Sequence, residues 1–200
     1  MPILSHLAGL YPVHLDKNQA MDVEDFVRQH RDVWIGIGEV GLDFWKVQAP
    51  EEREVQQEIF VRFIGLSKEL GLPLNVHTRS AGRHAIELLL DQEAEKVQMH
   101  AFDGKASTAM RAVEAGYFFS VPPSIVRSRQ KQKLVHRLPL SCLLVETDSP
   151  VLGPAPGVRN EPKNVTIAID AIADIKAVAR EHVMEIVYEN TVGLYGNAVV

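Results

Sequence analysis

Short apolar runs alternate with longer amphipathic stretches along almost the whole chain. The runs have the length and composition of β-strands, and the stretches between them carry apolar residues at helical spacing. This alternation is typical of a parallel sheet covered by helices, because parallel strands need a crossover connection and a helix supplies it. The pattern therefore predicts an α/β fold of about six strand–helix units.

The expected elements can be placed by residue number. We expect strands at 3–11, 33–40, 74–77, 97–101, 117–121 and 143–146. We expect helices at 20–30, 51–70, 83–90, 107–115, 130–137, 164–179 and 181–190. Gly71 should end the second helix, since glycine readily takes the left-handed conformation that terminates helices.

Composition limits the organisation of the chain and its partners. The 200 residues are 46% hydrophobic, which is enough to bury one sizeable core. There is no composition break or long Gly/Ser linker, so residues 1–200 are expected to form a single domain. The formal net charge of -5 argues against a protein that coats nucleic acid through bulk charge, so any contact with phosphate must be local.

The single cysteine and the absence of long apolar stretches bear on location. Cys142 lies in the apolar run CLLVE and has no second cysteine in the sequence with which to form a disulfide. This favours a reducing compartment, so we expect an intracellular protein of the cytoplasm or nucleus. No apolar stretch approaches the roughly 18 residues of a membrane span, and the first residues lack a secretory pattern. We expect no membrane partner. We also expect the protein to be a monomer.

Four of the apolar runs end on side chains that bind divalent metals, namely Glu39, His77, His100 and Asp148. In a parallel barrel every strand delivers its last side chains to the same rim, so these four are expected to meet in one polar site. A two-metal hydrolytic site needs a bridging oxygen ligand, imidazoles that fix an ion, and a carboxylate that takes a proton from water. Taken singly, each residue is more often an ordinary core or surface side chain, so the prediction depends on the set.

Two neighbouring residues extend this site. Residues two apart on a strand share a face, so Glu146 points the same way as Asp148, and Asn75 the same way as His77. We expect Glu146 and Asn75 to orient the metal ligands from behind. An ordinary ion pair is the alternative for Glu146.

Two arginines are candidates for binding a substrate phosphate. Arg79 follows His77 by two residues, and Arg159 lies in the long Pro- and Gly-bearing loop at 149–162. Long ordered loops that follow a strand often line a binding site, so this loop is expected beside the metal ligands. A solvated surface position is the alternative for each arginine.

The segments GEVGLDF, NVHTRS, MHAFDG and ETDSP, in this order and spacing, resemble the TatD family of metal-dependent deoxyribonucleases, which belong to the amidohydrolase-like TIM barrels. The resemblance runs from about Gly9 to Asn190, and several segments look most like the third animal paralogue of that family. It implies an eight-stranded α/β TIM barrel, of which about six units are expected here. It also implies two divalent metal ions, Zn²⁺, Mg²⁺ or Mn²⁺, and hydrolysis of phosphodiester bonds in DNA or nucleotides.

The resemblance also assigns roles to the four strand-end residues. Glu39 would bridge both ions, His77 and His100 would hold one ion, and Asp148 would hold the other and act as general base. Glu39 and Asp148 are thus the expected catalytic residues. The family's Gly-x-His-Pro turn is present as GLYP, with Tyr11 in place of a histidine expected to contact substrate.

Both ends of the sequence depart from the family's pattern. The family's opening strand carries an Asp-x-His-x-His motif, and this strand and the next strand and helix have no counterpart in the sequence. We therefore expect an N-terminally truncated barrel in which one of the two metal sites is incomplete. The final helix resembles that of the family as far as Asn190.

Three functions remain open on the sequence. The first is a deoxyribonuclease that cleaves phosphodiester bonds with a metal-activated water. The second is a catalytically impaired chain that binds at most one metal, because the opening histidines are missing. The third is a related metal-dependent hydrolase that acts on an ester or amide outside nucleic acids. Such relatives often bridge their ions with a modified lysine, whereas this chain offers Glu39, which favours the nuclease.

Overall fold

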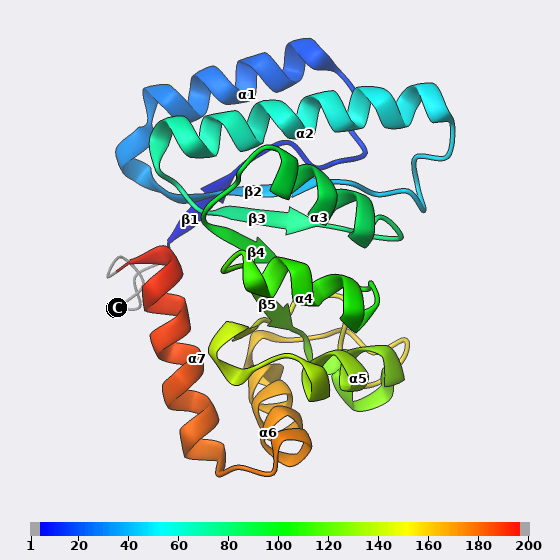
Figure 1. Ribbon diagram of the computed structural model, residues 1–200, viewed down its shortest axis with the longest axis vertical. Coiled ribbons are helices and arrows are strands. Elements are labelled where there is room, and N and C mark those ends of the chain that lie inside the picture. The colour runs from blue at the N-terminus through cyan, green and yellow to red at the C-terminus, as the bar shows by residue number, and fades with distance from the viewer. Residues whose placement is uncertain (1–4, 197–200) are drawn as a thin grey trace.

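The structure, a computed structural model, describes residues 5–196, and these residues contain a six-stranded parallel sheet (Figure 1). The strands lie side by side in sequence order as β1 (His6–Ala8), β2 (Trp34–Gly41), β3 (Leu74–His77), β4 (Val97–Met99), β5 (Phe118–Val121) and β6 (Leu143–Val145). Every neighbouring pair is parallel, so the strands present their carboxyl ends at one edge. The predicted parallel sheet is confirmed. Ile3 and Leu4, at the start of the predicted first strand, lie outside the described residues.

Helices connect the strands as the alternation predicted. Within residues 5–196 they are α1 (Lys17–Gln29), α2 (Pro50–Leu70), α3 (Gly82–Asp91), α4 (Ala106–Glu114), α5 (Arg129–Arg137), α6 (Val165–Lys176) and α7 (Arg180–Tyr195). Short 3-10 turns lie at Arg31–Val33, Pro123–Arg127, Leu140–Cys142 and Pro162–Asn164. Gly71 ends α2 with a φ of 65°, as predicted. None of the helices described in this range has both the length and the apolar character needed to cross a membrane.

Several element boundaries differ from the prediction. β1 ends at Ala8 rather than at residue 11, α1 begins at Lys17 rather than at residue 20, and α6 ends at Lys176 rather than at residue 179. The strand predicted at 97–101 ends at Met99, because Ala101 has a φ of 41° and cannot continue an extended strand. The last helix continues past residue 190 to Tyr195. Its final turn is held by tertiary contacts, since Leu194 is buried and the Tyr195 hydroxyl donates a hydrogen bond into the sheet.

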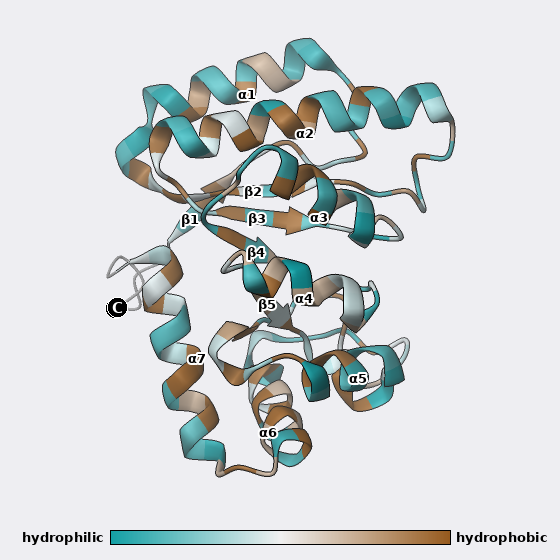
Figure 2. Ribbon diagram, in the orientation of Figure 1, coloured by the Kyte–Doolittle hydropathy of each residue, from teal (hydrophilic) through white to brown (hydrophobic). Residues whose placement is uncertain are grey.

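The two faces of the sheet differ in chemistry because successive side chains on a strand alternate between faces. One face carries buried apolar side chains that share a single core cluster with the helices, including Leu74, Val76, Val97, Met99, Phe119 and Leu143. Figure 2 shows hydrophobic and hydrophilic colours alternating along the helices, as expected of helices that cover a sheet with one side. The opposite face carries polar groups, with Asn75, Gln98 and Ser120 on adjacent strands. This polar face leads to the carboxyl ends of the strands.

Candidate metal centre

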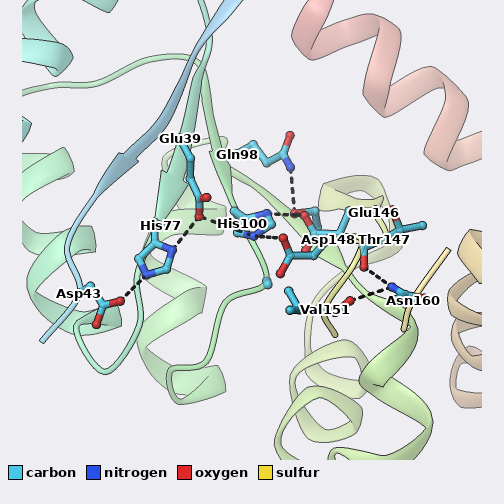
Figure 3. Close-up of polar contacts among 12 residues, drawn as sticks. Glu39, Asp43, His77, Gln98, His100, Glu146, Thr147, Asp148, Val151 and Asn160 are labelled. Carbon is cyan, nitrogen blue, oxygen red and sulfur yellow. Dashed lines mark hydrogen bonds and ion pairs between the residues drawn. The ribbon is translucent and has the colours of Figure 1, made fainter. Parts of the chain in front are cut away.

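The four predicted ligands lie together at the carboxyl edge of the sheet (Figure 3). Glu39 is near the end of β2, His77 is the last residue of β3, His100 follows β4 directly, and Asp148 follows β6. The Nδ1 atom of His77 is 2.6 Å from Glu39 Oε1. His100 Nε2 lies 3.6 Å from Glu39 Oε1 and 3.5 Å from Asp148 Oδ1. His100 therefore sits between the two carboxylates, and the predicted convergence is observed.

A register shift in β2 brings Glu39 to the polar face. Ile37 pairs with Leu74 and Val40 pairs with Val76, so two residues of β2 lie opposite the single residue Asn75. Strict alternation would place Glu39 on the same face as Ile37, in the apolar core. The extra residue lets Glu39 face His77 and His100, and Gly38 makes the close approach possible, since a Cβ there would lie 2.7 Å from the Cβ of Asn75.

Asp43 holds the second nitrogen of His77, and sequence reasoning missed it. Its Oδ2 atom lies 3.1 Å from His77 Nε2, and the residue is fully buried. Its Oδ1 atom accepts hydrogen bonds from the backbone N–H groups of Trp45 and Lys46, at 3.1 and 2.8 Å. The available signal was an aspartate inside the same GEVGLDF segment, two residues past the end of β2. A buried carboxylate in such a turn needs donors, and an imidazole is one of them here.

Glu146 holds His100 from behind. The distance from Glu146 Oε2 to His100 Nδ1 is 2.5 Å, and the Ser120 hydroxyl donates to the same oxygen at 2.8 Å. Burial acts to lower the pKa of His100, but the hydrogen bonds with Asp148 and Glu146, together with the charges of Glu146 and Glu39, raise the pKa to about 10. Glu146 leaves Nε2 as the ring nitrogen that faces the other carboxylates.

The charge of the cluster suits a divalent cation. Glu39, Asp43, Glu146 and Asp148 bring four carboxyl groups together, and among residues 5–196 their ion-pair partners are the two histidines and no lysine or arginine. Each imidazole has one nitrogen toward Glu39 and the other held by a further carboxylate. An imidazole held in this way by an outer carboxylate is the usual arrangement of a metal ligand in proteins.

The distances around His100 fit a shared ion, whereas the distance between His77 and Glu39 is too short for one. Two ligand atoms that each lie about 2.1 Å from an ion at a tetrahedral angle are about 3.4 Å apart. The separations from His100 Nε2 to Glu39 and Asp148, 3.6 and 3.5 Å, agree with that value. His77 and Glu39 are closer, in direct hydrogen-bond contact at 2.6 Å. Accordingly, no three His, Cys, Asp or Glu side chains in the described part of the chain form a ready metal site, and the His77 hydrogen bond would have to open to admit an ion.

The loop after β6 places Asp148. Asp148 has a φ of 55°, and its backbone carbonyl accepts a hydrogen bond from the Val151 N–H. Buried Asn160 closes the loop by donating from Nδ2 to the Thr147 and Val151 carbonyls at 2.6 and 2.9 Å, as Figure 3 shows. The long loop thus begins at the cluster, as expected, and Asn160 is a second residue that sequence reasoning missed.

The remaining predicted residues make no hydrogen bond or ion pair with the cluster among the contacts of residues 5–196. The Arg79 guanidinium stacks 3.7 Å from the centre of the Trp45 ring, and Arg159 is exposed in the loop. Asn75 Oδ1 is buried without a hydrogen-bond partner among the described residues. Tyr11 packs edge-on against His77, with the ring centres 5.3 Å apart.

Solved structures share this fold. A TatD homologue from Escherichia coli matches with a TM-score of 0.86 and 23% identity, over 96% of this chain and 76% of that one. A TatD family hydrolase from Entamoeba histolytica matches with a TM-score of 0.84 and 20% identity, over 96% and 74% of the two chains. With the parallel sheet and its helices, these likenesses confirm the predicted α/β TIM-barrel-like fold.

Sequence comparisons find relatives of higher sequence identity. Human deoxyribonuclease TATDN3 is 52% identical over 171 residues, which cover 84% of this chain and 62% of that protein. A putative deoxyribonuclease from Xenopus laevis, tatdn3-B, is 47% identical over 87% of this chain and 63% of its own length. The uncharacterized metal-dependent hydrolase YabD of Bacillus subtilis is 34% identical over 80% and 65% of the two chains. The chain therefore spans a little under two thirds of these relatives.

The family model described as TatD related DNase matches residues 2–196, which is nearly the whole chain. The four motifs that suggested the resemblance all lie inside this match. The chain belongs to the family of TatD-related DNases.

Proposed function

We propose that this chain is a metal-dependent hydrolase that cleaves phosphodiester bonds in DNA or nucleotides. The observation that carries the proposal is the convergence of Glu39, His77, His100 and Asp148 on one edge of the sheet, where His100 lies between the two carboxylates. The names of the relatives, deoxyribonuclease and metal-dependent hydrolase, support the same chemistry.

These four residues would hold the metal. Glu39 would bridge two ions, His77 and His100 would complete the coordination of one, and Asp148 would bind the other. Zn²⁺, Mg²⁺ and Mn²⁺ suit a set of imidazoles and carboxylates. A divalent ion bound there would polarise a phosphoryl oxygen and lower the pKa of a bound water. With fewer ligands offered at Asp148 than at Glu39, the second ion is expected to bind more weakly than the first.

Other side chains of the site orient the imidazoles and accept a proton. Asp43 and Glu146 hold the outer nitrogens of the two imidazoles and so set the direction of the inner ones. Asp148 is the group to accept a proton from the attacking water, because its side chain keeps 29% of its surface exposed whereas Asp43 is fully buried. The Glu39 side chain keeps 27% of its surface exposed, which leaves it accessible to an ion.

Two arginines are proposed to bind substrate phosphate. Arg79 is held against Trp45 close to the turn that carries Asp43, and its charge has no carboxylate partner among the ion pairs of residues 5–196. Arg159 adjoins Asn160, which closes the loop that follows Asp148. Both therefore lie on segments that flank the cluster, and a guanidinium on either would pair with phosphate oxygens.

The test is cleavage of an end-labelled single-stranded DNA oligonucleotide by the purified chain with Mg²⁺, Mn²⁺ or Zn²⁺. We expect cleavage that a chelator abolishes and that Asp148→Asn lowers at least about 100-fold, the usual loss for a general base. Asp170→Asn is the matched control, because Asp170 is an exposed carboxylate on α6 that pairs only with Arg180 among the described residues. Cleavage that survives chelation, or metal binding without any cleavage, would refute the assignment.

A further inference from the structure

A row of hydrogen-bonded polar groups crosses the polar face of the sheet and ends at the candidate metal centre. The Tyr195 hydroxyl donates to Gln98 Oε1 at 2.5 Å, and Gln98 Nε2 donates to Ser120 Oγ at 2.9 Å. Ser120 Oγ donates to Glu146 Oε2 at 2.8 Å, and the same oxygen lies 2.5 Å from His100 Nδ1. The row thus joins the last turn of α7 to a proposed metal ligand, and Figure 3 shows its inner part from Gln98 to His100.

The donors in this row all point the same way. Tyr195 can serve Gln98 only as a donor, because the amide oxygen of Gln98 is an acceptor. The amide nitrogen of Gln98 then donates to the Ser120 oxygen, which leaves the Ser120 proton for Glu146. Glu146 is an acceptor when ionised, so the proton between it and His100 belongs to Nδ1 of His100. With Nδ1 as the N–H, Nε2 of His100 is the nitrogen that would bind a cation in exchange for its proton.

The buried side chains of this row have few alternative hydrogen-bond partners. Gln98 and Ser120 are buried, and the Tyr195 ring lies against β2, since a Cβ at Gly36 would be 3.2 Å from Tyr195 Cε1. Asn190, earlier on α7, anchors the helix by donating to the Leu140 and Leu143 carbonyls at 3.0 and 2.8 Å. A buried amide deprived of a partner is costly, so loss of the Tyr195 hydroxyl would favour reorientation of Gln98.

We propose that Tyr195 is a positioning residue for the metal centre, acting through Gln98 and Ser120 to hold Glu146 and thereby the ring of His100. This inference rests on the proposed role of His100 as a metal ligand. It adds that the final turn of α7, which reaches the polar face of the sheet through the Tyr195 hydroxyl, sets the affinity of the centre.

The test compares Tyr195→Phe with Tyr188→Phe. Tyr195→Phe keeps the ring and removes only the hydroxyl, while Tyr188 is an exposed tyrosine on the same helix. Mn²⁺ affinity, measured by competition with a chromophoric chelator, should fall about three- to tenfold in Tyr195→Phe, the value of one neutral hydrogen bond. Ser120→Ala breaks the row next to Glu146 and should weaken affinity by about 10–100-fold. Tyr188→Phe should match the unmodified chain.

A second readout does not need metal or turnover. With ¹⁵N-labelled histidine, the ring N–H proton of His100 in its short contact with Glu146 should give a strongly downfield resonance. We expect Tyr195→Phe and Ser120→Ala to shift it and Tyr188→Phe to leave it in place. A purely structural role for Tyr195 would lower the unfolding midpoint while Mn²⁺ affinity and this resonance stay unchanged, and that result overturns the proposal. A chain that binds Mn²⁺ without cleaving DNA refutes the nuclease and leaves this test intact.

Discussion

Replacement of Asn160 by alanine should loosen the loop that carries Asp148. Asn160 is buried, and its Nδ2 atom donates to the carbonyls of Thr147 and Val151. Its Oδ1 atom accepts from the Glu161 N–H at 3.0 Å and from Asn164 Nδ2 at 2.8 Å. One side chain thus supplies four hydrogen bonds to a loop that otherwise has little regular structure.

The expected loss of stability depends on whether water can replace Asn160 as the partner of the two carbonyls. A polar group left without a partner costs about 1–3 kcal/mol when it stays buried, and much less when water replaces the lost bond. Thr147 is partly buried and Val151 is exposed, so water can reach the loop in part. The lower half of the range, about 1–2 kcal/mol, therefore applies to each of the two carbonyls. Asn160→Ala should reduce the free energy of unfolding by about 2–4 kcal/mol.

Urea unfolding monitored by circular dichroism measures this change, and titration with Mn²⁺ measures the effect on the site. Mn²⁺ binding should weaken along with stability, because Thr147 precedes Asp148 directly. Asn164→Ala is the control, since of the four bonds it removes only the one to Asn160 Oδ1. If Asn160→Ala were no more destabilising than Asn164→Ala and bound Mn²⁺ normally, the view that Asn160 positions Asp148 would be wrong.

Three further predictions concern the other parts of the site. Because the pKa of His100 is raised to about 10 from an ordinary 6.5, its protonation should stabilise the metal-free fold fully below pH 6.5, with this contribution lost as pH rises toward 10. Urea midpoints of the chain and of His100→Gln across that range check it, and a constant difference would contradict it. Asp43→Asn should weaken Mn²⁺ binding about 10–100-fold by calorimetric titration, and an unchanged affinity would remove Asp43 as the group that orients His77. Gly41→Ala should destabilise by at least about 3 kcal/mol in urea, because its Cβ would lie 2.2 Å from the His77 carbonyl oxygen at a φ of 134°, whereas Gly65→Ala, with open space around it, should not destabilise.

Most of the fold could be predicted from the sequence because hydrophobic periodicity is a local signal. The strand at 74–77 and the end of α2 at Gly71 match the structure, since apolar runs and a terminating glycine carry their own information. The last turn of α7 could not be predicted in this way. Tyr195 bonds a strand far away in the chain and Leu194 is buried, and no local sequence pattern predicts these contacts.

The site was predictable where topology alone decides. Strand ends of a parallel sheet meet at one edge, which was enough to bring Glu39, His77, His100 and Asp148 together. Local irregularities were not predictable, and the register shift that turns Glu39 inward is one of them. Asp43 was missed for a similar reason, because its contact with His77 depends on the turn after β2 rather than on a strand end.

The central claim is that these four strand-end residues bind a divalent cation. Crystals soaked in Mn²⁺ and measured for anomalous scattering test it directly. We predict a peak roughly 2.0–2.3 Å from His100 Nε2 and from carboxylate oxygens of Glu39 or Asp148, with the hydrogen bond between His77 and Glu39 opened toward the ion. A peak elsewhere, or none, with His77 still bonded to Glu39, would contradict the account.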